Sequence, residues 1–256
     1  MTLDELLTWA LPQRGLRWRG FRRNRRQVVR RVQDRIGTLE LSGAAAYRQF
    51  LDEHPDEWTV LDALCRVTIS RFARDREVWN ALVGEVLPRL ACEASTATAW
   101  SAGCGAGEEP FTLAIAWMLE IAPRWPDVRL EVIATDIDDT QLARAAVGEF
   151  PPGSRHELGA WQAAAFEGAG IGERFRRAVR FENRDLRAGA PGGPFDLVLC
   201  RNLAYSYFDE GAQRVVTEMF RAAMRAGGVL VVGGEEELPA GCAGFAAIGH
   251  GMYEAR

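Results

Sequence analysis

Apolar residues recur at helical spacing over the first 90 residues of the chain. Three such stripes are Leu6, Leu7 and Ala10; Ala44, Tyr47, Phe50 and Leu51; and Leu61, Leu64 and Cys65. Apolar side chains three and four positions apart line one side of an α-helix. The alternation of apolar and polar residues that is typical of a strand is missing from this part of the sequence. Residues 1–90 are therefore predicted to form a small all-helical N-terminal domain.

The pattern changes from residue 97 onward. Short apolar runs cover residues 97–101, 130–135, 195–200 and 228–232, and helical patterns cover residues 110–119, 140–146 and 210–224. Strands that alternate with helices are typical of a parallel sheet covered by helices on its faces. The pattern is weaker between residues 148 and 179, where a helix is expected at 160–166. We predict an α/β domain over residues 91–256, with the boundary between residues 88 and 97.

Composition excludes several kinds of chemistry. All 31 basic residues are arginine, so a lysine Schiff base and a phosphate-loop lysine are both ruled out. The three histidines are isolated and the five cysteines form no CxxC pair, which argues against a metal site and a disulfide framework. No apolar run reaches the ~18 residues that a membrane span requires. We expect a cytoplasmic protein without a metal site and without a membrane span.

Charge is concentrated near the N-terminus, although the net charge is only −4. Residues 14–35 contain ten arginines and a single acid, Asp34. Read as a helix, residues 27–36 place Val28, Val29, Val32 and Ile36 on one side and most arginines elsewhere. Such a basic helix can dock an acidic protein, attract nucleic acid, contact anionic lipid or simply be solvated. The arginines lack the interleaved aromatic residues of base-stacking surfaces, which disfavours nucleic acid.

A glycine-rich turn is the most informative segment. Residues 101–110, SAGCGAGEEP, follow one predicted strand and open a predicted helix. The glycines form G-x-G-x-G, with Glu108 where a dinucleotide-binding turn would need its third glycine. Acids at a helix start would repel a phosphate that the helix dipole attracts. Glu108 and Glu109 therefore favour a cationic or zwitterionic ligand, although Glu108 could instead cap its helix.

Asp136 ends the next predicted strand. In doubly wound folds, an acid at this place binds the hydroxyls of a ribose. Each feature alone is weak evidence, because a G-x-G-x-G sequence is often only a tight turn. Together, a glycine turn with acids and a ribose carboxylate indicate S-adenosylmethionine, whose sulfonium is positive and whose nucleoside carries no phosphate.

These motifs, together with residues 195–202 (FDLVLCRN), resemble the CheR family of chemotaxis-receptor methyltransferases. Residues 67–75 resemble the segment that joins the family's two domains, and residues 228–239 resemble its late strand and turn. The arginine-rich helix is similar to the family's basic N-terminal helix. The resemblance implies a Rossmann-like class I methyltransferase sheet preceded by a helical domain. It also implies S-adenosylmethionine as donor, S-adenosylhomocysteine as product and a protein glutamate as the usual acceptor.

The resemblance implies roles for single residues as well. The residues expected to line the cofactor are Thr68, Ser70, Arg74, Gly103, Gly105, Glu109, Asp136, Asp185, Leu186, Arg201 and Asn202. Glu109 is expected near the methionine portion, Asp136 on the ribose, and Asp185 with Leu186 at the adenine. Arg74 is expected to orient the acceptor carboxylate or to hold the site closed, the alternative being a structural ion pair. Alignment of the donor methyl group with the acceptor oxygen provides much of the rate acceleration of such a transfer, and an ionised carboxylate needs no base to deprotonate it.

Three departures from the family pattern leave the acceptor open. The spacer after the CRN sequence is one residue longer, so either Tyr205 or Tyr207 could face the acceptor. The late Gly-His-Ser-Glu is replaced by Gly-Gly-Glu-Glu at 233–236, and a paired phenylalanine by Phe72-Ala73. The receptor-gripping β-subdomain is shortened in the interval 148–185, where residues 175–181 are the one strand candidate.

These departures keep two alternatives beside the carboxylate O-methyltransferase. The first is a relative that methylates a small metabolite at oxygen or nitrogen. The second is an idle cofactor-binding module that uses the arginine helix to bind a partner, such as an acidic protein, or nucleic acid.

Overall fold

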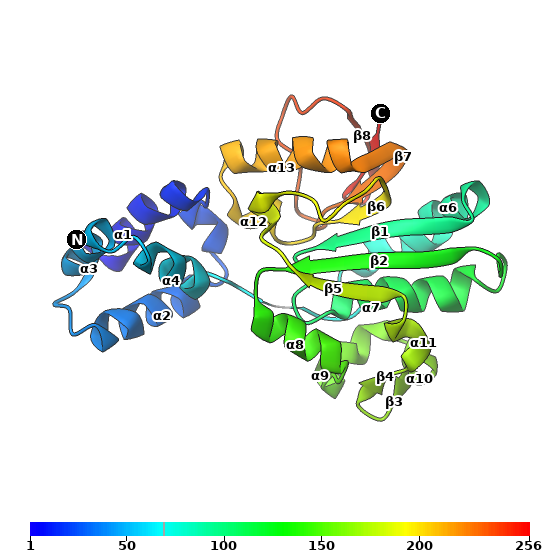
Figure 1. Ribbon diagram of the computed structural model, residues 1–256, viewed down its shortest axis with the longest axis horizontal. Coiled ribbons are helices and arrows are strands. Elements are labelled where there is room, and N and C mark those ends of the chain that lie inside the picture. The colour runs from blue at the N-terminus through cyan, green and yellow to red at the C-terminus, as the bar shows by residue number, and fades with distance from the viewer. Residues whose placement is uncertain (69) are drawn as a thin grey trace. The chain divides into compact units, whose positions relative to one another are not determined.

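The computed structural model describes residues 1–68 and 70–256, and these form two compact units (Figure 1). The first unit contains Met1–Thr68 and Ser206–Gln213, and the second contains the other described residues. This division differs from the boundary expected near residue 90. Helices α5 (Arg76–Ala81) and α6 (Leu87–Glu93) belong to the second unit, because Trp79 and Leu87 are buried in the same core as the sheet.

The described elements of Met1–Thr68 are helical, as predicted. They are α1 (Leu3–Ala10), the 3-10 turns η1 (Leu11–Arg14) and η2 (Trp18–Phe21), α2 (Arg25–Thr38), α3 (Ala44–Glu53) and α4 (Glu57–Leu64). The expected apolar sides face inward for the most part: Val28, Val32 and Ile36 of α2 are buried, whereas Val29, Phe50 and Leu64 are only partly buried. None of the helices that the structure describes combines the length and the apolar character needed to cross a bilayer.

The first unit also includes a segment from late in the sequence, Ser206–Gln213. Arg17 N donates to Tyr207 O at 2.9 Å, and the Phe21 and Tyr207 rings lie 4.8 Å apart between centroids. Gly20 permits this approach, since a Cβ there would lie 2.2 Å from Ser206 O. The arginine-rich segment therefore has a structural role, which is to hold the stretch that follows Tyr205.

A buried ionic cluster connects three helices of the first unit. Glu57 is 5% exposed and accepts two hydrogen bonds from the Arg35 guanidinium, at 2.9 and 2.7 Å. The Tyr47 hydroxyl donates to the same carboxylate at 2.7 Å. The Arg35 hydrogen bonds hold the pKa of Glu57 below its ordinary value, against the opposing effect of burial. Glu57 thus ties α4 to α2 and α3 in its ionised form.

Replacing Glu57 with glutamine should lower the free energy of unfolding by about 1.5–3 kcal/mol at pH 7, the range for hydrogen bonds to charged groups. A depressed carboxyl pKa stabilises the fold above the unfolded-state value of 4.5 and loses that contribution as the pH falls through the lower folded value. The difference from wild type should therefore narrow below about pH 4.5. Urea titrations across this pH range measure the free energy of unfolding, with the exposed Glu53→Gln as control. An equal difference between Glu57→Gln and wild type at pH 7 and pH 3.5 would contradict the prediction.

The second unit is built on a seven-stranded sheet of order β5-β2-β1-β6-β7-β9-β8 (Figure 1). The strands are β1 (Thr96–Ala102), β2 (Arg129–Asp136), β5 (Val179–Asn183), β6 (Phe195–Leu199), β7 (Met224–Val231), β8 (Phe245–Gly249) and β9 (Met252–Ala255). The pairs β5-β2, β2-β1, β1-β6 and β6-β7 are parallel, and β9 runs antiparallel to β7 and β8. The chain order reverses between β1 and β6. In open α/β sheets, ligands bind at the carboxyl ends of the strands beside such a reversal.

Helices cover both faces of this sheet. Ala97 and Ala99 of β1 pack in one core with α6 and α7 (Glu108–Ala116). The neighbouring Trp100 points to the opposite face, where its ring meets Phe220 of α13 (Glu210–Ala223) edge-on at 5.3 Å. The α/β class and the four predicted strands are confirmed. Helix α8 (Asp139–Val147) also matches its predicted range.

The interval between β2 and β6 contains mainly short elements. They are α8, α9 (Pro152–Arg155), η5 (His156–Leu158), α10 (Trp161–Ala165), β3 (Phe166–Glu167), β4 (Gly170–Ile171), α11 (Glu173–Arg176), β5 and η6 (Leu186–Ala188). The helix expected at 160–166 is confirmed as α10. The strand expected at 175–181 is wrong in its first half, because Phe175 lies buried in α11 and the strand starts at Val179. The β3–β4 hairpin was missed, since strands of two residues show no periodicity.

Candidate functional site

The glycine turn between β1 and α7 is fixed against the end of β2. Gly103, Gly105 and Gly107 have φ values of 80°, 55° and 95°, a region that side chains other than glycine rarely adopt. Gly103 N and Cys104 N both donate to Thr135 O, at 2.8 and 2.9 Å. The turn is closely packed at the carboxyl edge of the sheet, since a Cβ at Gly103 would lie 2.2 Å from Leu203 Cδ2 and one at Gly107 would lie 3.0 Å from the Ala145 Cβ.

Asp136, the last residue of β2, lies directly beside this turn. Its Oδ2 accepts a hydrogen bond from Gly105 N at 2.8 Å, and its Oδ1 accepts one from Asp138 N at 2.9 Å. Two motifs that are 31 residues apart in sequence are thus brought together by the pairing of β1 with β2. The carboxylate has a single orientation, which its two backbone donors determine.

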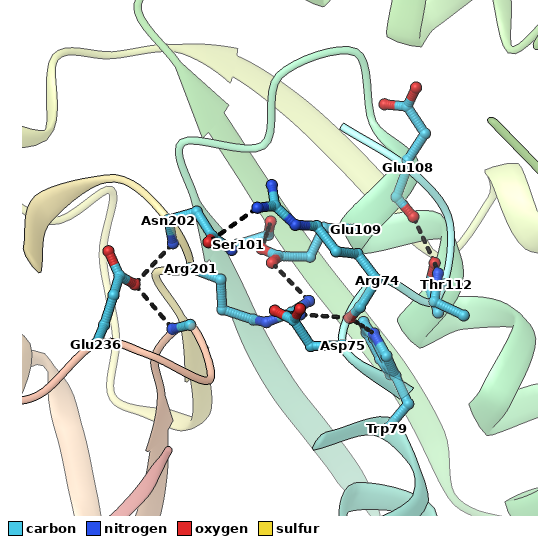
Figure 2. A network of polar contacts seen from close by, with 12 residues as sticks. Arg74, Asp75, Trp79, Ser101, Glu108, Glu109, Thr112, Arg201, Asn202 and Glu236 are labelled. Carbon is cyan, nitrogen blue, oxygen red and sulfur yellow. Dashed lines mark hydrogen bonds and ion pairs between the residues drawn. The ribbon is translucent and has the colours of Figure 1, made fainter. Parts of the chain in front are cut away.

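The two acids at the start of α7 point in different directions (Figure 2). Glu109 accepts a hydrogen bond from Ser101 Oγ at 2.7 Å and faces Arg201. Glu108 interacts instead with the Ser70 side chain, and its Oε2 is buried without a hydrogen-bond partner among the described residues. Glu108 does not cap the helix, because the N-cap is Gly107. Burial raises the pKa of both carboxyl groups, and the Arg201 guanidinium opposes this for Glu109.

Arg201 follows β6 and is the centre of a buried network (Figure 2). Its side chain is 4% exposed and lies 2.8 Å from the Asp75 carboxylate and 3.4 Å from that of Glu109. Its guanidinium also donates to Arg74 O and lies 5.6 Å from the ring centroid of Trp79. Arg201 therefore compensates two carboxylates and fixes the main chain of the segment that carries Arg74.

Arg74 lies in a turn with unusual backbone angles. Its neighbours Ala73 and Asp75 have φ values of 50° and 63°. Trp79 Nε1 donates to Arg74 O at 3.0 Å, and the Arg74 guanidinium donates to Asn202 Oδ1 at 3.1 Å. The Arg74 guanidinium thus has the neutral amide of Asn202 as one partner, and the ion pair that the sequence left open for it stays a prediction.

The other predicted residues are spread over both units. Asp185 caps η6 through Arg187 N at 2.8 Å and forms a two-pronged ion pair with the Arg187 guanidinium, which the sequence did not indicate. Leu186 is buried next to it in sequence. Thr68 belongs to the first unit. Ile69, inside the motif of residues 67–75, lies outside the described residues.

The two candidate tyrosines have different surroundings. Tyr205 is 3% exposed and its hydroxyl lies 3.0 Å from Thr217 Oγ1 of α13. Burial raises the pKa of Tyr205. Tyr207 belongs to the first unit, where Asn24 Nδ2 donates to its hydroxyl at 3.2 Å. The hydroxyl of Tyr205 thus points at a helix of the sheet domain, and that of Tyr207 at the segment before α2.

Sequence reasoning missed four members of the network: Asp75, Trp79, Ser101 and Glu236. Asp75 and Glu236 stand inside motifs that the sequence does distinguish, residues 67–75 and 228–239. Nothing in those motifs indicates that Asp75 pairs with Arg201, or that Glu236 accepts a hydrogen bond from Asn202 N at 2.7 Å. Asp75 meets Arg201, and Glu236 meets Asn202, because the fold brings the loops that carry them together at the edge of the sheet.

The site residues fit S-adenosylmethionine. The positive-φ glycines give the main chain a tight turn at the end of β1, and the adjacent Asp136 suits the hydroxyls of a ribose. The carboxylates of Glu108 and Glu109 at the start of α7 suit a ligand with positive charge and disfavour a phosphate. Glu108 Oε2, which has no hydrogen-bond partner in the part of the chain that the structure describes, is a further buried acceptor at this turn. The fold and the site together define an S-adenosylmethionine-dependent methyltransferase.

Comparison with known proteins specifies the family. The model of the CheR methyltransferase SAM-binding domain matches residues 68–250, and the chain belongs to this family. It is 34% identical over 182 residues to a chemotaxis protein methyltransferase of Listeria monocytogenes, covering 69% of this chain and 68% of that protein. It is 30% identical over 233 residues to chemotaxis protein methyltransferase 2 of Vibrio cholerae, covering 85% and 80%.

A solved structure is similar at a lower level. The N-methyltransferase NodS of Bradyrhizobium japonicum, in complex with S-adenosyl-L-homocysteine, is 15% identical with a TM-score of 0.37. The match covers 62% of this chain and 63% of that one. A similarity at this level adds nothing to the family assignment.

Proposed function

We propose that the protein transfers the methyl group of S-adenosylmethionine to a carboxylate, and that the acceptor is a glutamate side chain of another protein. The observation that carries this proposal is the placement of Arg74, whose guanidinium is held at Asn202 in the same network as Glu109. An arginine fork suits an acceptor carboxylate, which it can orient through charge-assisted hydrogen bonds. The bound cofactor supplies a methyl group on a positive sulfonium. An ionised carboxylate needs no base, so positioning by the protein supplies the catalysis.

For the remaining site residues we propose the roles that the family resemblance implies. Asp136 receives the ribose hydroxyls, Glu109 faces the methionine amino group, and Gly103 and Gly105 admit the ligand to the main chain. Asp185 and Leu186 border the adenine. Thr68 and Ser70 lie along the cofactor. Arg201 and Asn202 close the cofactor site after β6. Of the two candidate tyrosines, Tyr205 is the weaker one for contact with the acceptor. The Tyr205 hydroxyl is buried against Thr217, which favours a packing role.

Transfer of radioactive methyl groups from labelled S-adenosylmethionine tests the acceptor class. The panel contains receptor signalling domains rich in glutamate, the same domains with glutamine in place of glutamate, and small carboxylic acids. We expect label on the glutamate-containing protein that is released as methanol by mild base, since methyl esters are base-labile. A methyl product that survives base would contradict carboxylate transfer.

A small-molecule acceptor is the second candidate. It is favoured by the short interval between α8 and β5, whose one described sheet is the β3–β4 hairpin of two residues per strand. In the same assay, label in a low-molecular-weight fraction and none on protein would support it. Turnover of any acceptor would rule out an idle cofactor-binding module.

We further propose that the arginine-rich segment docks an acidic protein surface. Several of its ten arginines have partners inside the first unit: Arg14 pairs with Asp62, Arg25 with Asp4 and Arg35 with Glu57, and Arg17 and Arg31 donate to main-chain carbonyls. Arg22, Arg26 and Arg30 are exposed and stand four residues apart. Arg26 and Arg30 lie on one side of α2, and Arg22 lies in the turn before it. These three residues form the basic stripe.

Reversing the basic stripe with Arg22→Glu, Arg26→Glu and Arg30→Glu should lower kcat/KM for an acidic protein acceptor about tenfold at low salt. The loss should shrink as salt is added, because screening weakens surface charge effects. Affinity for S-adenosylhomocysteine should stay unchanged. Reversal of the exposed Arg76, Arg129 and Arg177 in the second unit serves as the control. Equal losses in the two triple variants would contradict a specific docking role.

A further inference from the structure

A buried glutamate joins two loops at the carboxyl edge of the sheet. Glu236, in the loop after β7, is 8% exposed. Its Oε2 accepts a hydrogen bond from Asn202 N at 2.7 Å and another from Gly233 N at 2.8 Å (Figure 2). Hydrogen bonds from backbone N–H groups to a carboxylate are about twice as strong as neutral ones. One oxygen atom therefore connects the loop after β6 to the loop after β7.

The Asn202 backbone needs such support. Its φ of 57° lies in the left-handed region, which asparagine tolerates better than most residues but at a cost relative to the right-handed region. In this conformation the Asn202 N–H points to Glu236 and the side-chain Oδ1 accepts from the Arg74 guanidinium at 3.1 Å. The contact with Arg74 thus depends on a backbone conformation that Glu236 stabilises.

The packing around Gly233 shows that these groups are fitted to one another. A Cβ at Gly233 would lie 2.8 Å from Glu236 Oε2 and 3.1 Å from Asn202 Oδ1. A side chain at this position would displace both groups. The contact between Glu236 and Asn202 therefore requires a glycine at position 233.

We infer that Glu236 is a positioning residue for methyl transfer. By holding Asn202 in the left-handed conformation, it sets where the Asn202 amide stands and hence where the Arg74 guanidinium is held. Without the carboxylate, the N–H groups of Asn202 and Gly233 lose their acceptor, the Asn202 backbone relaxes, and the amide leaves Arg74. This inference rests on the proposed placement of Arg74 and Asn202 at the cofactor.

Titration calorimetry with S-adenosylhomocysteine tests the inference without any methyl acceptor. Glu236→Ala should raise the Kd about tenfold or more, the range for a lost hydrogen bond to a charged group. Glu236→Gln should stay within about threefold of wild type, because the amide oxygen can accept both N–H groups. Glu237→Ala, the exposed neighbour, is the matched control and should bind like wild type. Glu236→Asp keeps the charge but shortens the reach, so it should resemble Glu236→Ala and replaces that variant if alanine prevents folding.

A double-mutant cycle separates positioning from general stability. Asn202→Ala should itself weaken binding about tenfold, and adding Glu236→Ala to it should cost less than a further threefold, because both changes remove one coupled contact. Full additivity of the two losses would overturn the positioning role, as would a folded Glu236→Ala with wild-type affinity. Wild-type affinity of both Asn202→Ala and Arg74→Ala would instead overturn the proposed placement of the site, and the positioning role with it.

Discussion

Asp136→Ala is expected to weaken binding of S-adenosylmethionine about a hundredfold. The substitution removes the carboxylate proposed for the ribose hydroxyls and also the acceptor that Gly105 N uses at 2.8 Å. Two hydrogen bonds to a charged group are worth about 3 kcal/mol together, and 1.4 kcal/mol corresponds to a factor of ten. Calorimetry with S-adenosylmethionine and with S-adenosylhomocysteine measures the effect.

Two further variants make this result specific. Asp136→Asn keeps one acceptor oxygen for the Gly105 N–H, so its affinity should lie between those of the alanine variant and wild type. Asp127→Ala changes an exposed acid in the turn before β2 and should leave affinity unchanged. A folded Asp136→Ala that binds within threefold of wild type would contradict the ribose role.

Arg201→Met is expected to destabilise the second unit by about 3–5 kcal/mol. Removing one partner of a buried ion pair leaves the other charge buried and uncompensated, which lowers the free energy of unfolding more than replacing both partners with apolar residues does. Here the guanidinium is 4% exposed and faces the carboxylates of Asp75 and Glu109. Arg201→Lys should recover only part of the loss, because one ammonium group lacks the planar fork that reaches several acceptors at once. Thermal and urea unfolding measure the effect, with the exposed Arg76→Ala as control.

The pH dependence of Arg201→Met provides an internal check. Burial raises the pKa of Glu109, and removing the opposing guanidinium raises it further. A carboxyl with a raised folded pKa favours folding below its unfolded value of 4.5 and disfavours it as the pH rises through the folded value. The loss of stability should therefore be larger at pH 8 than at pH 5. Adding Glu109→Gln should restore part of the stability at pH 8 but not methyl transfer; no restoration would show that Glu109 and Arg201 are not coupled.

Local features of the sequence predicted much of the fold. The helical stripes of residues 1–68 and the four apolar runs of the sheet depend on periodicity within a few residues, and the structure confirms them. The glycine turn was visible for the same reason, because its three glycines have the positive φ values that other residues avoid. Errors occurred where local signals were weak, as at the two-residue strands β3 and β4 and at the start of β5.

The domain boundary could not be read from periodicity alone. Helices α5 and α6 have the same local pattern as the helices before them, and what assigns them to the sheet domain is the core in which Trp79 and Leu87 are buried. Likewise, no local signal indicates that Ser206–Gln213 belongs with the N-terminal helices. Which core an amphipathic helix covers depends on contacts that are distant in sequence.

The sequence by itself determined the class of fold, the glycine turn, the acid at the end of β2 and the family resemblance, because each is written in a short run of residues. Only the tertiary structure decided that Arg201 pairs with Asp75 across 126 positions and that Glu236 holds Asn202 across 34. These contacts exist because the strand order brings the loops after β6 and β7, and the turn before α5, to one carboxyl edge. The sequence shows that a carboxylate is present but does not show which group it pairs with. The fold determines the partner, because it buries the carboxylate at a place where leaving its charge uncompensated would cost too much free energy.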